Sequence, residues 1–409
     1  MPPLNHHSPD HAERLWTPHF LALNLIYFLA LANMAVFFHF VRFLDGLGFD
    51  HDQAGLIVGS FAFIGLILRP LVSPLMGPGN ARRYLFWSTL ATVASLLAYP
   101  LVQGFAGWLL LRLVHGAAYI TMATAATAAL VGVIPPARSA QAFGVFGVVT
   151  LLPYAVIPPF LEPLERLAGG YTQLLAVTGL AMLGILPLLV LLAPPGGAAR
   201  QSQPGRLGWA ELRQNFRLPG IALCLSLSLA AYCAFAALFY FIEPAARDRG
   251  LSGVVGLFFA VNTAAEIATR LFLGRFLDRV RKGLALGLSL ALVAVCFVLL
   301  AMVSGQWELL ALGVGFGLGW GVAMPLFNSV LFDLSPPRLR AVNANLGMEM
   351  FSGGFFLGPG LAGFLTQHWG FAPLFLACAG SCLAAGGLAL GLRPAAGGES
   401  RERDKGVGE

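Results

Sequence analysis

Long apolar stretches alternate with short polar connections along almost the whole chain. Each stretch has about the 20 residues that a helix needs to cross the hydrocarbon core of a bilayer. Gly and Pro inside these stretches are tolerated in a membrane helix, because neighbouring helices satisfy the freed backbone groups. The pattern predicts twelve transmembrane helices, at residues 19–41, 52–75, 84–103, 106–131, 140–161, 171–193, 218–243, 251–273, 284–303, 307–332, 342–365 and 371–392.

The longest polar connection, residues 193–220, is rich in Pro, Gly, Gln and Arg and separates the first six stretches from the last six. The polar N-terminus lacks the basic-then-apolar order of a cleaved signal, so the first helix is expected to remain. The sequence therefore predicts an all-α polytopic membrane protein. Its expected parts are a six-helix half at 1–193, a cytoplasmic linker at 194–217, a second six-helix half at 218–392 and a disordered cytoplasmic tail at 393–409.

The two halves carry an internal repeat. A shift of 201 positions, the distance from Arg69 to Arg270, aligns three landmarks without a gap. Repeated six-helix halves around a central site are a common design of secondary transporters. The landmarks are Gly55-Leu56 on Gly256-Leu257, Arg69 on Arg270, and Pro135-Pro136 on Pro336-Pro337.

Composition and charge fix the environment and the orientation. The chain is 57% hydrophobic and 11% charged, which is more apolar than one soluble core can hide. Placing both termini in the cytoplasm leaves only Arg42, Arg166, Arg247 and Arg249 in the outer connections, out of 25 Lys and Arg. The positive-inside rule therefore predicts an integral protein of the cell (inner) membrane with cytoplasmic termini. Topology also explains the net charge of +6, so no nucleic-acid partner is invoked.

Several chemistries lack their sequence signatures. The chain has no GxxxxGK[ST] loop for ATP, and no HExxH, paired CxxC or GxSxG stretch, so an enzyme is not expected. The cysteines lie in apolar helices of the second half without metal-ligand spacing and are interpreted as small packing residues. No cofactor or metal is expected. The five cysteines are Cys224, Cys233, Cys296, Cys378 and Cys382.

Three short motifs carry a family resemblance. The loop after the eighth helix reads GRFLDRVRKG from Gly274 to Gly283, the fourth helix carries RLVHG from Arg112 to Gly116, and the eleventh carries GPGLAG from Gly358 to Gly363. On these helices, within a repeat, they resemble the GxLxDRxGRR, RxxQG and GPxxG motifs of the major facilitator superfamily. The resemblance spans roughly residues 18–393 and implies a transporter with that family's twelve-helix fold.

The resemblance implies a gating role for the cytoplasmic loop, which in the family latches helix ends and lets them part during alternating access. The alternative is that the loop's cations only orient the protein. In the first half, Gly77 stands where the family has an acid, so that latch is expected to be weaker. The candidate gating residues are Arg69, Arg270, Gly274, Asp278, Arg279 and Lys282.

Charges within the apolar helices are candidates for proton coupling, because an ionised group in hydrocarbon is costly and usually faces a partner or a cavity. Glu266 lies four residues before Arg270 on one helix face, so it is either a paired structural group or a proton carrier. Arg112 either couples protons, as the family motif implies, or only ties helices together. Glu349, about four residues into the eleventh helix, either carries a proton or lies at the cytoplasmic mouth. Glu243 and Asp333 are interpreted as residues of helix boundaries.

A second group is expected to line a central cavity and meet a ligand. His115 and Tyr119 share a helix face with Arg112, and Tyr119 aligns with Trp320 in the repeat. His39 aligns with Tyr240 and is either a packing residue or part of a proton relay. The full set is Asn33, His39, His115, Tyr119, Tyr232, Tyr240, Trp320 and Asn328.

Together these features predict a secondary transporter working by alternating access, with a small-molecule substrate, protons as the coupling ion and the lipid bilayer as partners. The leading hypothesis is efflux of a small amphipathic organic compound by antiport. Uptake of an organic anion by symport is the alternative, since the fifth helix reads Ile157-Pro158-Pro159 where family antiporters carry GPxxG. A non-transporting membrane receptor or scaffold is a remote third. The oligomeric state is open, and a monomer is compatible with the sequence.

Overall fold

The computed structural model describes residues 15–77, 79–131, 133–134, 138–192, 215–277, 280–336 and 339–392. Within these residues the chain folds into helices without a strand, which confirms the predicted all-α class. Its contacts form two compact units. The first unit joins Met1–Phe37 to Ile67–Gln201, and the second joins Phe38–Leu66 to Ser202–Glu409. The predicted division into 1–193, 194–217, 218–392 and 393–409 stays a prediction, and the tail and residues 193–214 lie outside the described residues.

The first unit is a set of long helices joined by tight connections. Its first helix begins where Thr17 Oγ1 accepts a hydrogen bond from the Phe20 N–H at 3.2 Å, and Pro18 follows at a position that needs no backbone donor. A later helix of this unit, α7, ends at Gly169, whose φ of 86° is a conformation that favours glycine. The helices are α1 (Pro18–Val36), α4 (Ala81–Ala98), α5 (Gly104–Val131), α6 (Ser139–Val156), α7 (Leu161–Ala168), α8 (Tyr171–Met182) and α9 (Ile185–Leu191).

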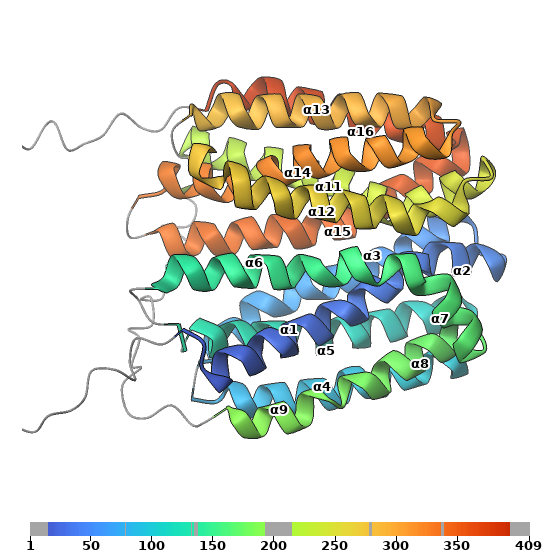
Figure 1. Cartoon of the computed structure of the whole chain (residues 1–409), viewed down its shortest axis with the longest axis vertical. Coiled ribbons are helices and arrows are strands. Elements are labelled where there is room, and N and C mark those ends of the chain that lie inside the picture. The colour runs from blue at the N-terminus through green and yellow to red at the C-terminus, as the bar shows by residue number, and fades with distance from the viewer. Residues whose placement is uncertain are drawn as a thin grey trace, which may run out of the picture. The chain divides into compact units, whose positions relative to one another are not determined.

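The second unit is a bundle of helices that run alongside one another (Figure 1). Successive long helices run in alternating directions, so we name the two ends of this bundle by the first and last residues of α11. The Asp248 end also holds α2 and the start of α3, a helix that spans His51–Val72. The other helices are α2 (Phe40–Gly46), α11 (Pro219–Asp248), α12 (Ser252–Leu277), α13 (Lys282–Met302), α14 (Gln306–Leu334), α15 (Arg340–Trp369) and α16 (Phe371–Ala389).

The internal repeat is visible in both helix boundaries and packing, which confirms it. The pairings of α1 with α6, α4 with α5 and α4 with α8 recur as α11 with α15, α13 with α14 and α13 with α16. Equivalent helices therefore use equivalent faces. Four pairs of helices begin 201 residues apart, at Pro18 and Pro219, His51 and Ser252, Ala81 and Lys282, and Ser139 and Arg340.

Eleven helical segments of the described chain are long and apolar enough to span a membrane. The remaining predicted span, the eleventh, is α15, which has the length but carries several polar side chains, including Asn343, Glu349 and Gln367. Two expectations were wrong in detail. The seventh predicted helix does not stop at residue 243, because α11 continues through Pro244 to Asp248. The short helices α2 and α7, which lie outside the main apolar stretches, were not foreseen.

Candidate functional site

A buried polar cluster in the first unit surrounds Arg112 on α5. The Arg112 side chain has no exposed surface, and its guanidinium lies 4.5 Å from the centre of the Phe37 ring, a cation–π geometry. His115, one turn further along α5, is also fully buried, with its ring 5.3 Å from that of Phe37. The cluster thus joins the end of α1 to the middle of a transmembrane helix.

His115 connects two more residues to this cluster. Its Nδ1 lies 3.1 Å from the Tyr99 hydroxyl, and its Nε2 lies 3.3 Å from Asn33 Nδ2. With the amide in this orientation, Nε2 accepts a hydrogen bond from Asn33 and the Nδ1–H donates to Tyr99. Two of the predicted cavity residues, Asn33 and His115, are therefore in direct contact. We call Asn33, Phe37, Tyr99, Arg112 and His115 the Arg112 cluster; Tyr119 is half-buried further along α5.

The second unit holds its own buried charge on α12. Glu266 is buried and forms an ion pair with Arg270, one turn away, as the shared helix face suggested. Three glycines of α14, Gly313, Gly317 and Gly321, allow this helix to approach α12 closely. A Cβ at Gly321 would lie 2.9 Å from the Thr269 Cβ and 3.2 Å from the Glu266 Cα. This seam between α12 and α14 therefore leaves little room beside the ion pair.

An aromatic cluster lies next to that seam and contains three of the predicted cavity residues. Trp320 on α14 is fully buried and packs edge-on against Phe235, with ring centres 5.4 Å apart. Tyr232 and Tyr240, both buried on α11, pack against Phe351 and Phe355 at 5.2 Å and 6.2 Å. The cluster therefore joins α11, α14 and α15. Two other predicted cavity residues lie outside this cluster: His39 is buried beside Phe38, and Asn328 is exposed on α14.

The predicted gating residues are described in part. Lys282, at the start of α13, forms an ion pair of 2.7 Å with Asp333 near the end of α14. Arg69 is half-buried near the C-terminal end of α3, and Arg270 pairs with Glu266 as stated above. Gly274 belongs to α12, whereas Asp278 and Arg279 lie outside the described residues.

One expectation about Glu349 was wrong. Helix α15 begins at Arg340, so Glu349 lies nine residues after its first residue, in the third turn. The N-terminal dipole acts only within the first turn, so it does not explain a carboxylate here. Glu349 is half-buried, and its role in proton coupling stays a prediction.

Sequence reasoning missed a second buried ion pair, at the Asp248 end of the second unit. Glu243 is 1% exposed, and its Oε1 lies 3.2 Å from Nη1 of Arg42 on α2, which is 31% exposed. Glu243 is therefore not a boundary residue, because α11 continues past it by more than a turn. A signal was present, since the 201-residue shift aligns Arg42 with Glu243.

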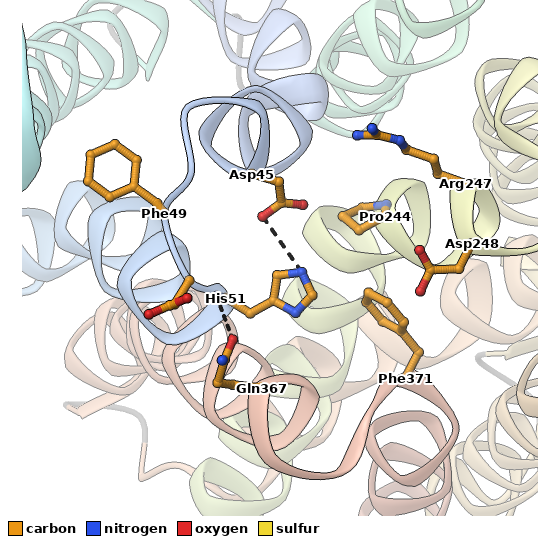
Figure 2. A pocket seen from close by; sticks show the side chains of 9 residues that line it. Asp45, Phe49, His51, Pro244, Arg247, Asp248, Gln367 and Phe371 are labelled. Atoms are coloured by element: carbon orange, nitrogen blue, oxygen red, sulfur yellow. Dashed lines mark hydrogen bonds and ion pairs between the residues drawn. The ribbon is translucent and has the colours of Figure 1, made fainter.

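A pocket of about 350 Å³ opens at the same end of the second unit, with His51 at its centre (Figure 2). The His51 Nε2 lies 3.6 Å from Asp45 Oδ1, and the His51 backbone N–H donates to Gln367 Oε1 at 3.1 Å. The pocket therefore connects α2, α3, α11, α15 and α16. Its lining residues are Asp45, Phe49, Asp50, His51, Pro244, Arg247, Asp248, Gln367 and Phe371.

Glycines draw α15 tightly against both α3 and α11. A Cβ at Gly363 would collide with the His51 carbonyl, and one at Gly358 would lie 2.6 Å from the Cys233 carbonyl oxygen. From the other side, a Cβ at Gly55 would collide with the Pro359 carbonyl. The GPGLAG motif of α15 is therefore the seam along which these three helices meet.

These features define a polytopic helical membrane protein built from two repeated sets of helices, with charged residues buried inside both compact units. The family model described as Major Facilitator Superfamily matches residues 23–350 and also residues 253–407. The chain belongs to the Major Facilitator Superfamily, and it is a transporter rather than an enzyme.

Relatives agree with this assignment over different lengths. The chain is 29% identical over 139 residues to the quinolone resistance protein NorA of Staphylococcus aureus, a match that covers 34% of this chain and 36% of that protein. The nucleoside transporter NupG has the same fold with a TM-score of 0.71, at 14% identity, over 91% of this chain and 98% of that one. A bacterial homologue of the human lysosomal transporter Spinster gives 0.71 at 15% identity, over 91% and 93%. At these identities the solved structures share the fold alone.

Proposed function

We propose that this protein is a proton-coupled antiporter that exports a small amphipathic organic compound across the cell membrane by alternating access. Both termini lie on the cytoplasmic side in this proposal, because that orientation leaves few cations on the outer side. The Pro219 end of the second unit is then cytoplasmic, and the Asp248 end is outer. The division into two six-helix halves with a cytoplasmic linker is part of the same proposal.

The observation that carries the proposal is the Arg112 cluster. An arginine is costly to hold inside a membrane protein, and a role in helix packing alone would be served by apolar residues. Here the guanidinium is fully buried over Phe37, one turn from a histidine whose two nitrogens are both hydrogen-bonded. A histidine in such a network passes or holds a proton, and the adjacent cation makes its charged form sensitive to any anion that enters.

Glu266 is the second proposed proton-coupling residue. Its carboxylate is buried beside Arg270, so protonation would release the arginine and change the local charge. Glu349 is kept as a third, on α15. A carboxylate beside Arg270 and a histidine beside Arg112 suit proton coupling better than they suit a sodium site, which needs several oxygen ligands together.

The substrate class follows from the aromatic cluster of α11, α14 and α15. Rings such as Tyr232, Tyr240 and Trp320 provide a broad apolar surface with polar edges, which suits amphipathic organic molecules. The segment match to a quinolone resistance protein supports the same class and the export direction. Asn33, His39, His115, Tyr119 and Asn328 complete the proposed ligand-contacting set.

The test uses purified protein in proteoliposomes that contain a pH-sensitive dye. Lipophilic cations and quinolone-type compounds are added in turn, and proton movement is followed. Proton flux opposite to substrate flux is the expected result. Flux of both in the same direction, with organic anions as substrates, would instead support uptake symport, and Arg112 would then be an anion ligand.

The variant Arg112→Ala tests the role of the Arg112 cluster. It should abolish coupled flux, at least 100-fold below the natural chain, a loss on the order of about 2.7 kcal/mol of transition-state stabilisation. Arg166→Ala is the matched control, because that arginine is largely exposed on α7. Normal flux in Arg112→Ala would remove the basis of the proposal. Loss of folded protein in Arg112→Ala but not in Arg112→Lys would show that the arginine only ties helices together.

A further inference from the structure

Two residues that the repeat makes equivalent form an ion pair in the second unit. Arg42 and Glu243 are 201 positions apart, the shift that relates the repeats, and they lie 3.2 Å from each other. Phe38 and Phe239 are also 201 apart, and their rings meet edge-on at 5.7 Å. Equivalent residues of two related copies touch each other only where the symmetry axis passes between them. Within the second unit, the local axis that relates residues 38–42 to residues 239–243 therefore runs between α2 and α11.

Opposite charges at two positions that the repeat makes equivalent show that the two copies have diverged there. If the repeats were identical there, two arginines or two glutamates would face each other and repel. Divergence into Arg42 and Glu243 converts that repulsion into a link between α2 and α11. The Glu243 carboxylate is almost fully buried. Neutralising it removes the ion pair with Arg42, whereas leaving it charged without a partner costs free energy of desolvation.

The same end carries further contacts that join the start of α3 to α2 and to α15. His51 meets Asp45 and Gln367, and Gly363 meets the His51 backbone. These contacts surround the pocket shown in Figure 2. We define the outer latch as Arg42, Asp45, His51, Glu243 and Gln367.

We propose that Glu243 is a proton-binding site of the transport cycle, with Arg42 as its counter-ion, and that proton uptake by Glu243 opens the outer latch. The inference rests on the proposed function only in naming the proton as the coupling ion. Protonation adds a hydrogen to the carboxylate and cancels its charge. The Arg42 guanidinium, already partly exposed, then turns toward water, and α2 with the start of α3 parts from α11 and α15.

Other charged groups lie at the Asp248 end of the second unit, and one of them, His51, responds to acid with the opposite sign. A proton on His51 creates a positive charge that attracts Asp45 on α2 and Asp248 on α11, so it would hold the latch closed. The direction of the acid response therefore tells Glu243 from His51. Gln367 on α15 and Phe371 on α16 are uncharged. The titratable or charged groups on the surrounding elements are His39, Arg42 and Asp45 at α2, Asp50 and His51 at the start of α3, and Arg247 and Asp248 on α11.

The experiment measures the width of this end directly, by electron–electron distance spectroscopy on the full chain in lipid nanodiscs. Spin labels are attached at Leu47→Cys, after α2, and Gly253→Cys, at the start of α12, in a chain whose five native cysteines are alanine. Leu47 is exposed, and a side chain at Gly253 meets no atom within 4 Å. Distances are recorded at pH 8 and pH 5.

With Glu243 present, acid should lengthen the label distance by about 10 Å, one helix diameter. Glu243→Gln imitates the protonated carboxyl and should give the long distance at both pH values. Exchange of the two charges, Arg42→Glu with Glu243→Arg, should restore the short distance at pH 8 and the response to acid. Glu162→Gln is the matched control, because that glutamate pairs with Arg166 on α7 in the other unit.

Three results would overturn the inference: an unchanged distance between the two pH values, a shorter distance in acid, or an acid response that survives in Glu243→Gln. Failure of the proposed function is a separate result. If the distance responds as described but proteoliposomes show no coupled flux, the latch is a pH-sensitive gate and proton coupling is wrong. If flux is coupled but Glu243→Gln keeps the acid response, the proposed function stands and the assignment of Glu243 fails.

Discussion

The buried charges of this protein are stabilised in two different ways. Arg112 lies over an aromatic ring with polar neighbours, whereas Glu266 and Arg270 neutralise each other within one helix. The two members of this ion pair are unequally buried, since the Glu266 side chain is 6% exposed and that of Arg270 is 31% exposed. Loss of one partner should therefore cost more when it leaves the glutamate alone.

This asymmetry gives a prediction for stability and transport together. Arg270→Gln should lower the midpoint of thermal unfolding in detergent more than Glu266→Gln does, because an unpaired buried carboxylate costs about 3–5 kcal/mol while a half-exposed arginine reaches water. The double variant should recover most of that loss. Coupled proton flux should stay absent in Glu266→Gln and in the double variant. Recovery of flux in the double variant would mean that the pair is only structural.

At the scale of residues, the sequence identified the charges in the apolar helices but only one of their partners. Glu266 and Arg270 could be paired in advance because a spacing of four residues places both on one helix face. Tyr99 could not be assigned to His115, because the two come from different helices and only packing brings them together. Glu243 was misjudged because a residue near the end of an apolar stretch usually belongs to a boundary, and the extra turns of α11 were not visible in the hydropathy.

At the scale of helices, the α15 seam depends on the absence of side chains at a few positions. Gly363 approaches the backbone of His51, whereas Gly360, one turn earlier on the same helix, has no atom near its missing side chain. The two positions share a helix, a residue type and an apolar setting. They therefore form a matched pair for testing whether α3 must lie close to α15.

Gly363→Ala should weaken the contact between α3 and α15 and reduce transport about 10-fold or more, while Gly360→Ala should transport normally. The reason is that a new methyl group at Gly363 forces backbone apart, and overpacking of a tight contact typically costs about 1–3 kcal/mol. Initial rates in proteoliposomes, normalised to folded protein, measure the effect. Equal rates for the two variants would show that the close contact is not needed for transport.

Helix positions were largely predictable from the sequence because a membrane span must be long and apolar whatever its neighbours are. The short helices α2 and α7 were not, since neither is long enough to give a hydropathy signal and both depend on what they pack against. The seam itself could be seen only as a glycine motif. Which helices it would join required the fold.

At the scale of the whole molecule, three of the four arginines that the proposed orientation places on the outer side have a local partner. Arg42 pairs with Glu243, and Arg166 pairs with Glu162 at 3.5 Å. Arg249 donates to the carbonyls of Leu300 and Ala301 at 2.7 and 3.0 Å, at the C-terminal end of α13.

The fourth outer arginine, Arg247, lines a pocket with the carboxylates of Asp45, Asp50 and Asp248. Three of the four arginines expected on the outer side thus have a local partner that reduces their weight in setting the orientation, and the fourth lies in a pocket that also contains carboxylates. Their presence there does not oppose cytoplasmic termini.

The orientation makes a direct prediction for accessibility in intact cells. Cysteines placed at Leu47 and Trp307, both exposed at the proposed outer end, should react with a membrane-impermeant maleimide added outside. A cysteine at Arg217, exposed at the Pro219 end, should react only after the membrane is permeabilised. The natural chain controls for background, since its cysteines are buried or half-buried. Labelling of Arg217→Cys in intact cells, with protection of Leu47→Cys, would invert the orientation, place Glu243 on the cytoplasmic side and make its proton enter from within.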